Sequence, residues 1–169
     1  GKRVVTKSGQ PRFELVHQPW NGESEVLGAG SPVDIVKGAD GRIWIYAGRE
    51  LVSASTHTAS KIVRFPIEEP NAVEVVWERT TVGLDNAQIS DDGTKMAACF
   101  PWPNGAVANL ENGSLKKMGH GCWTSMSPGS NPVPWLFDGR HRNITLFLPG
   151  ENKRQININS APGINGYEV

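Results

Sequence analysis

The stretch Asn86–Phe100 reads N-A-Q-I-S-D-D-G-T-K-M-A-A-C-F, with an apolar run on each side of an acidic turn. Asp side chains hydrogen-bond the backbone of a turn, and Gly accepts the positive φ that tight turns often require. Short apolar segments on both sides of such a turn are typical of a β-hairpin. One hairpin says little about a fold, so the deciding question is whether the pattern recurs.

The pattern recurs upstream and downstream. The further hairpins pair Val33–Val36 with Arg42–Tyr46 and Trp123–Ser127 with Val133–Phe137. Each hairpin is followed by two more segments of the residue types that favour strands. These segments are Lys61–Phe65 and Ala72–Trp77, Ala106–Leu110 and Ser114–Met118, and Asn143–Leu148 and Arg154–Ile158. The repeating unit therefore has four strands.

A four-stranded antiparallel unit repeated at about 40 residues predicts a β-propeller, in which each sheet covers its faces with its neighbours. We expect an all-β chain, a β-propeller built of four-stranded antiparallel blades, with about four blades or a partial propeller. The expected blades span residues 1–30, 31–83, 84–121 and 122–163, and residues 164–169 start or close a blade. We attribute the length of the second blade to a loop insertion over Leu51–Ser60.

The turn Ser90-Asp91-Asp92-Gly93-Thr94-Lys95 resembles the turn between the first two strands of TolB-type, WD-like propeller repeats. Ser127-Pro128-Gly129 is similar without the Asp, and Ala39-Asp40-Gly41-Arg42 is a third version. Such repeats occur in periplasmic translocation factors, in propeller domains of prolyl peptidases and in some polysaccharide lyases. The resemblance implies an exported protein, periplasmic or extracellular.

Two arrangements of the chain ends stay open. Tyr167–Val169 can pair beside Lys2–Thr6 and close a small ring, or the chain can be a slice of a larger propeller. We favour the slice, because six or seven blades are more usual for this repeat type. Its open blade edges predict self-association. Gly1 is not an initiator residue, so we expect a removed leader or an excised piece.

The composition argues against nucleic acid as a partner and against a membrane-spanning segment. The 17 basic and 17 acidic residues balance, which argues against nucleic-acid binding. No apolar run is long enough to span a membrane. We expect Cys99 and Cys122 to be two inert buried thiols rather than a disulfide.

One rim of the expected propeller carries the loops that enter each first strand and the loops that join second and third strands. Trp102 lies in one such loop between two prolines, where an exposed ring suits stacking on a sugar or anchoring a peptide. The strand tryptophans Trp44, Trp77, Trp123 and Trp135 are expected to pack between blades instead. The candidate ligand-binding residues of the rim are Trp102, His120, His141, Arg140, Arg142 and His57.

A divalent metal is the only cofactor that the sequence suggests, and exposed loop histidines are the simpler interpretation. Its candidate ligands are His57, His120, His141, Asp34 and Asp85, since neutral imidazoles and carboxylates bind such ions. Asp34 and Asp85 lie near the channel mouth if they open first strands, although turn or cap residues are the plainer reading. Asp40, Asp91 and Asp92 are expected to be structural turn residues on the opposite rim.

No standard catalytic motif is present. The sequence therefore favours a non-catalytic platform that binds a protein or carbohydrate ligand on the rim. One alternative is a metal-dependent, lyase-like carbohydrate enzyme of which this chain supplies part of the site. Another is a regulatory propeller domain of a larger hydrolase.

Overall fold

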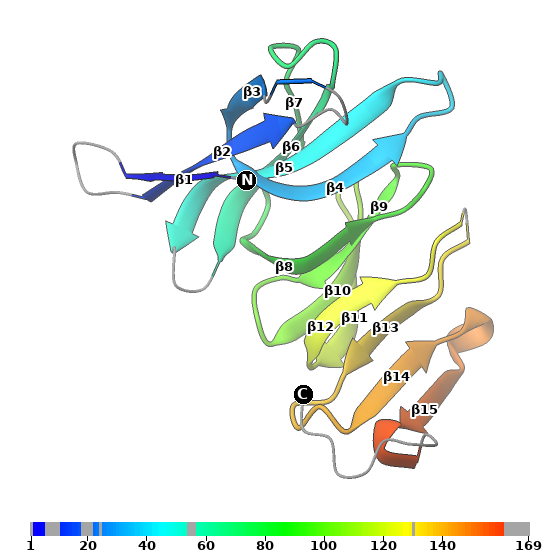
Figure 1. Cartoon of the computed structure of the whole chain (residues 1–169). Coiled ribbons are helices and arrows are strands. Elements are labelled where there is room, and N and C mark those ends of the chain that lie inside the picture. Colours follow the sequence, from blue (N-terminus) through cyan, green and yellow to red (C-terminus); the bar gives the residue numbers. More distant parts are fainter. Residues whose placement is uncertain are drawn as a thin grey trace.

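The computed structural model describes residues 2–5, 11–17, 22–23, 25–53, 57–129 and 131–160. These residues form antiparallel strands and two short 3-10 turns (Figure 1). The strands are β1 Lys2–Val5, β2 Pro11–His17, β3 Glu25–Ala29, β4 Ser31–Lys37, β5 Ile43–Ser53, β6 Thr58–Pro66, β7 Glu74–Trp77, β8 Val82–Ile89, β9 Lys95–Cys99, β10 Asn104–Asn109, β11 Leu115–His120, β12 Cys122–Met126, β13 Pro134–Phe137, β14 Asn143–Phe147 and β15 Lys153–Asn157, with η1 Pro149–Glu151 and η2 Ile158–Ser160.

The strands follow one another as up-and-down antiparallel neighbours, and we name four groups of them. Unit 1 is β1–β3, unit 2 is β4–β7, unit 3 is β8–β11 and unit 4 is β12–β15. Units 1 and 4 are separate sheets, whereas units 2 and 3 are joined into one sheet of eight strands. The expected all-β architecture of antiparallel four-stranded units is confirmed.

The turn between β8 and β9, the first two strands of unit 3, shows why this sequence makes a hairpin. The Asp92 carboxylate accepts hydrogen bonds from the Ser90 hydroxyl and from both the backbone N–H and the hydroxyl of Thr94. Gly93 takes a φ of 71°, in the left-handed region that suits glycine. Asp40 and Asp91 also lie in turns, as expected.

The expected loop insertion over Leu51–Ser60 was wrong. β5 continues to Ser53 and β6 begins at Thr58, so most of this segment is a long hairpin rather than a loop. Its end crosses to unit 3, where Thr58 and Ala59 pair with Gly83 and Val82 of β8. The β5–β6 extension, residues 49–53 and 57–61, therefore fuses two units into one sheet.

Hydrophobic contacts between units form the core. One cluster joins the inner side chains of unit 2, such as Tyr46 and Ile62, to those of unit 3, such as Met96 and Phe100. A second cluster packs Leu27 of unit 1 on side chains of unit 2. Units 1 and 2, and units 2 and 3, thus bury apolar side chains against each other.

Side chains also tie the inner strands β4, β8 and β12 to one another. Asp34 accepts a hydrogen bond from the Ile89 backbone N–H at 2.8 Å. Gln88 accepts bonds from the Ser125 hydroxyl and from the Met126 backbone N–H, and Asp91 accepts one from the Gly129 N–H. Asp34 is therefore a link between units 2 and 3.

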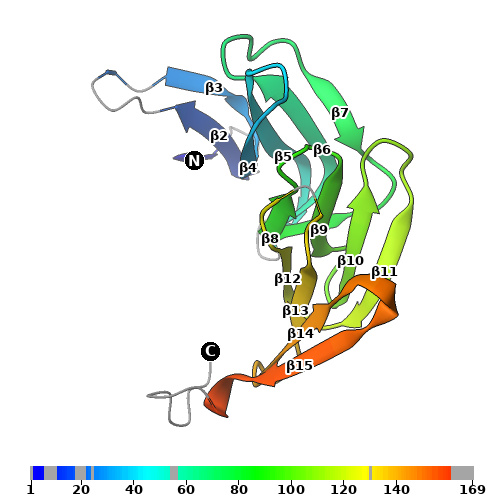
Figure 2. The same cartoon turned by 90° about the vertical axis from the view of Figure 1, so that its right-hand side faces the viewer.

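The four units follow a curved path with β4, β8 and β12 on the concave side, and the described parts of units 1 and 4 do not meet (Figure 2). Residues 164–169, expected to start or close a blade, lie outside the described residues. The expected blade boundaries stay a prediction. Within the described part of the chain, no helix is long and apolar enough to cross a membrane.

Candidate functional site

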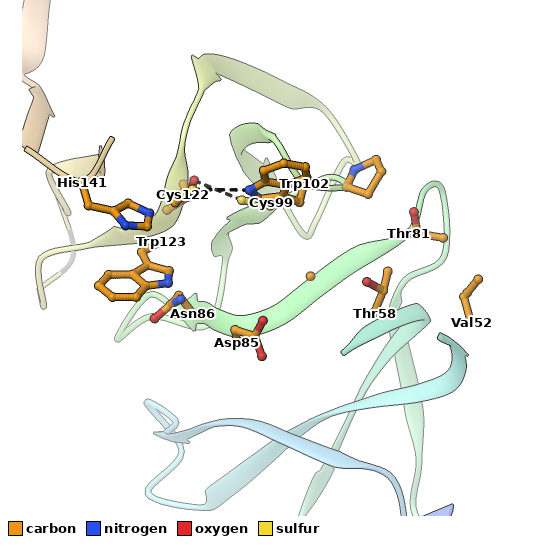
Figure 3. Close-up of a pocket in the computed structure, with 13 residues that line it drawn as sticks. Val52, Thr58, Thr81, Asp85, Asn86, Cys99, Trp102, Cys122, Trp123 and His141 are labelled. Atoms are coloured by element: carbon orange, nitrogen blue, oxygen red, sulfur yellow. Dashed lines mark hydrogen bonds between the residues drawn. The ribbon is translucent and has the colours of Figure 1, made fainter. Parts of the chain in front are cut away.

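A cavity of about 490 Å³ opens where units 2, 3 and 4 meet (Figure 3). The β5–β6 extension, the start of β8, the loop after β9, the start of β12 and the loop after β13 all contribute to it. The lining residues are Val52, Thr58, Thr81, Gly83, Asp85, Asn86, Cys99, Pro101, Trp102, Cys122, Trp123, Thr124 and His141. Its volume is within the usual range of small-ligand sites, about 300–1,000 Å³.

Trp102 reaches the cavity from the short β9–β10 loop. Pro101 and Pro103 flank it, and each proline ring restricts its own φ. The indole is 67% exposed, and its Nε1–H donates a hydrogen bond to Cys122 Sγ at 3.4 Å. The loop therefore holds a large apolar surface at the cavity without burying it.

Trp123 lies on the unit 4 side of the cavity. It is 37% exposed and stacks on the imidazole of His141, with ring centroids 5.2 Å apart and an interplanar angle of 12°. Phe137 packs edge-on against both rings. The ring packs within unit 4 and lines the cavity, so the expectation that Trp123 packs between blades was wrong.

Backbone strain gathers around this cavity. Among the described residues other than glycine, positive φ occurs at Glu50, His57, Trp123 and His141. Trp123 and His141 line the cavity, and His57 contacts a lining residue. Side chains pay of order 1–3 kcal/mol for such conformations, which cluster at ligand and active sites. This distribution is a second indication that the cavity is functional.

The two cysteines are free thiols, but they are not equivalent. Burial raises the pKa of Cys99, against a hydrogen bond with Thr124. Burial by itself would also raise the pKa of Cys122, but hydrogen bonds from Trp102 and His141 and the charge of His141 outweigh it and lower that pKa. The cysteines form no disulfide, as expected, but both are only half-buried and both line the cavity, so the expectation of buried thiols was wrong.

A Ser–His–Asp hydrogen-bond chain lies beside the cavity. His57 Nε2 is 2.7 Å from Ser31 Oγ, and its Nδ1 is 2.7 Å from Asp85 Oδ1. This is the connectivity of a serine-hydrolase triad, but the exposures are reversed. Ser31 is only 2% exposed, whereas the Asp85 side chain is 67% exposed. A buried hydroxyl is not accessible to a substrate. These hydrogen bonds therefore have a structural role: they link β4, the β5–β6 extension and β8.

The structure brings part of the predicted rim together. Trp102 and His141 both line the cavity, and His57 joins it through Asp85. His120 is exposed at the end of β11, and Arg140 and Arg142 are exposed in the β13–β14 loop. Those three residues do not line the cavity.

The predicted metal ligands do not gather. No group of three or more His, Cys, Asp or Glu side chains suited to a metal ion occurs in the described ranges. His57 pairs with Asp85, while Asp34 is engaged by backbone N–H groups of Ile35 and Ile89. Of the five candidates, His57 and Asp85 therefore lie together as a pair, but no third candidate ligand joins them among the described residues.

Sequence reasoning missed Cys122, Trp123 and Asn86 as cavity residues. Trp123 and Cys122 sit on a strand, and strand residues of these types are usually core. The signal for them was their place at the start of a first strand, directly after Gly119-His120-Gly121. Such starts lie on the same rim as the Trp102 loop.

Comparison with known proteins gives structural likeness alone. No family model matches the chain, and no curated protein matches it. A catalytically inactive virginiamycin B lyase from Staphylococcus aureus, solved with quinupristin, is similar with a TM-score of 0.53 and 10% identity. The match covers 94% of this chain and 55% of that one. The chain has the β-propeller fold.

Two further solved structures are similar at lower scores. A prolyl endopeptidase matches with a TM-score of 0.49 and 13% identity, over 93% of this chain and 28% of that one. A streptogramin B lyase matches with a TM-score of 0.45 and 12% identity, over 94% of this chain and 68% of that one. The propeller described here thus spans about half the length of the virginiamycin B lyase.

Proposed function

We propose that this propeller is a binding platform whose cavity holds a carbohydrate ligand. The observation that carries the proposal is the pair of partly exposed tryptophans, Trp102 and Trp123, on one cavity of about 490 Å³. Sites of this kind combine mostly apolar and aromatic walls with a few polar groups that fix orientation. Indole faces offer large contact area to the flat C–H face of a sugar ring.

The polar groups are present along β8. Asp85 and Asn86 are both exposed and both line the cavity. Figure 3 shows them on the wall across from Trp102. A carboxylate and an amide there supply acceptors and donors for sugar hydroxyls, while the tryptophans supply the stacking surface.

The test is calorimetric titration of the full chain with a panel of neutral and acidic oligosaccharides. We expect at least one to bind, and Trp102→Ala to weaken that binding about tenfold or more, or about 1.4 kcal/mol. The control is Ile156→Ala, which removes an exposed apolar side chain from β15, away from the cavity. Loss of binding in both variants, or in neither, argues against the cavity. If only peptides bind, the ligand class is wrong.

The finer expectations from sequence belong to the same proposal. A TolB-type repeat and an exported location fit a glycan-binding platform, and a regulatory domain of a larger hydrolase would use the same cavity to select substrates. A metal-dependent lyase is less well supported, because no three of its candidate ligands lie together in the described residues. Metal-dependent release of unsaturated products from acidic polysaccharides would favour it.

A further inference from the structure

A single carboxylate gives the wall of the cavity its charge. Asp85 is the only Asp or Glu among the described lining residues, and neither Lys nor Arg is among them. Its side chain is 67% exposed, and His57 engages one of its two oxygens, Oδ1. Within the described part of the chain, the other oxygen, Oδ2, takes part in no hydrogen bond. A ligand in the cavity therefore meets a carboxylate that can still pair with it.

The matching residue of the neighbouring unit is used differently. Asp34 is the fourth residue of β4, as Asp85 is of β8. Both oxygens of Asp34 accept hydrogen bonds from backbone N–H groups, Oδ1 from Ile35 and Oδ2 from Ile89. Links within the fold thus account for the whole carboxylate of Asp34, but for only half of the carboxylate of Asp85.

The β13–β14 loop carries further charges just outside the lining. Asp138 lies close enough to the cavity wall for its negative charge to oppose the ionisation of Cys122. Arg140 and Arg142 are exposed in the same loop and do not line the cavity. The Asp85 carboxylate therefore sets the sign of the charge that a bound ligand meets on the described wall.

The two cavity tryptophans suit a cation as well as a sugar ring. Indole is the best aromatic partner for a cation that lies within about 6 Å of the ring centroid. The chain contains such a contact elsewhere, since the Arg64 guanidinium lies over the Trp44 ring at 4.5 Å. Trp102 is 67% exposed, so its ring has surface left for a ligand cation.

We propose that the sugar bound in the cavity carries a positively charged nitrogen, as an amino sugar does. This inference rests on the proposed carbohydrate function and narrows its ligand. The charged nitrogen pairs with the Asp85 carboxylate, the sugar ring lies on the tryptophans, and the Asn86 amide binds hydroxyl groups. An acidic sugar fits poorly, because its carboxylate would approach Asp85 with no Lys or Arg of the described lining to offset the repulsion.

The experiment is calorimetric titration of the full chain with trisaccharides of N,N,N-trimethylglucosamine, N-acetylglucosamine and glucuronic acid. The trimethylated nitrogen keeps its charge at every pH, so the titration can be run at about pH 8, where ordinary imidazoles are neutral. We expect the charged sugar to bind about tenfold more tightly than the N-acetylated sugar, and the acidic sugar to bind most weakly. The preference should shrink as salt is added.

Asp85→Asn tests the source of the preference. Asn keeps an oxygen that can accept the His57 Nδ1–H but removes the charge. The ratio of the affinities for the trimethylated and the N-acetylated sugar should fall from about ten to about one. Asp40→Asn is the matched control, because it makes the same change in a turn of unit 2 outside the lining. It should leave the ratio at about ten.

The outcomes separate this inference from the proposed function. Equal affinity for the charged and the neutral sugar, or a preference that survives Asp85→Asn, overturns the amino-sugar assignment and leaves carbohydrate binding standing. If none of these sugars binds, both fall. Tetramethylammonium is the last ligand tested. If it binds as tightly as the charged sugar, the cavity recognises a cation without a sugar, and the amino-sugar assignment is wrong.

Discussion

At the scale of single residues, Asp92 fixes the turn on which the repeat depends. Partial burial would raise its pKa, but the hydrogen bonds from Ser90 and Thr94 and the charge of Lys95 lower it to about 2. The carboxylate is thus more stable ionised in the folded chain than in the unfolded chain. Its stabilisation is complete above the unfolded value of about 4 and is lost as the pH falls toward 2.

We therefore expect Asp92→Asn to lower the free energy of unfolding at pH 7 by about 1 kcal/mol, after allowance for solvent screening. Urea unfolding at a series of pH values measures this effect, and the variant should approach the parent chain below pH about 2. Asp40→Asn is the control, because the Asp40 carboxylate accepts the Arg42 backbone N–H in the matching turn of unit 2. Equal losses in both turns would contradict a special role for Asp92.

The amino-acid sequence predicted the turn residues better than it predicted the residues that line the cavity. Asp-Gly turn chemistry is local, so Asp92 and Gly93 could be assigned from neighbours in sequence. The environment of Cys122 depends on Trp102 and His141, which come from other hairpins. No pattern of neighbouring residues in the sequence indicates these interactions, and a cysteine on a strand is usually predicted to be a core residue.

At the scale of elements, the junction between β11 and β12 is the tightest point near the cavity. A Cβ on Gly121 would lie 2.2 Å from the Phe137 backbone oxygen and 2.6 Å from Leu136 Cδ1. Gly121 also donates its backbone N–H to Pro103 O at 2.9 Å. Only glycine fits there, and Cys122 follows it directly.

Gly121→Ala should lower the free energy of unfolding by about 2–3 kcal/mol, because backbone must move to admit the methyl group. Gly139→Ala is the matched control, since a Cβ there meets nothing within 4 Å. It should change stability by no more than about 0.5 kcal/mol. Urea denaturation of the two variants gives the comparison, and a large loss at Gly139 would show that the contact argument fails.

The strands were largely predictable because alternating apolar and β-branched segments with Gly turns mark them locally. The β5–β6 extension was not. Its residues Arg49-Glu50-Leu51-Val52 carry no strong strand signal, and the pairing with β8 that holds the extension is non-local. The long interval between the first two turn repeats was therefore predicted to be a loop, although most of it forms the β5–β6 hairpin.

At the scale of the whole molecule, units 2 and 3 share a sheet and a core, whereas no strand of unit 3 pairs with a strand of unit 4 among the described residues. Leu84 lies at the shared region, 4% exposed, against Gly48 of β5. Regions that share strands and core contacts open together.

Leu84→Ala should therefore cost about 2–5 kcal/mol and speed amide hydrogen exchange in both unit 2 and unit 3. Leu136→Ala, an equally buried leucine of β13, should speed exchange mainly in unit 4. Hydrogen exchange followed by mass spectrometry of peptides from each unit decides between these patterns. Uniform loss across all units in both variants would show that the chain opens as one body.

The β6–β8 pairing also bears on how such a chain can change its number of repeats. A repeat can be duplicated or deleted cleanly only where its neighbours do not share a hydrogen-bonded ladder. Units 2 and 3 share one through Thr58, Ala59, Val82 and Gly83, so a recombination point between them would leave an unpaired edge. The junction at Gly121 has no such ladder in the described residues. When repeats are gained or lost in evolution, we therefore expect units 2 and 3 to be duplicated or deleted together.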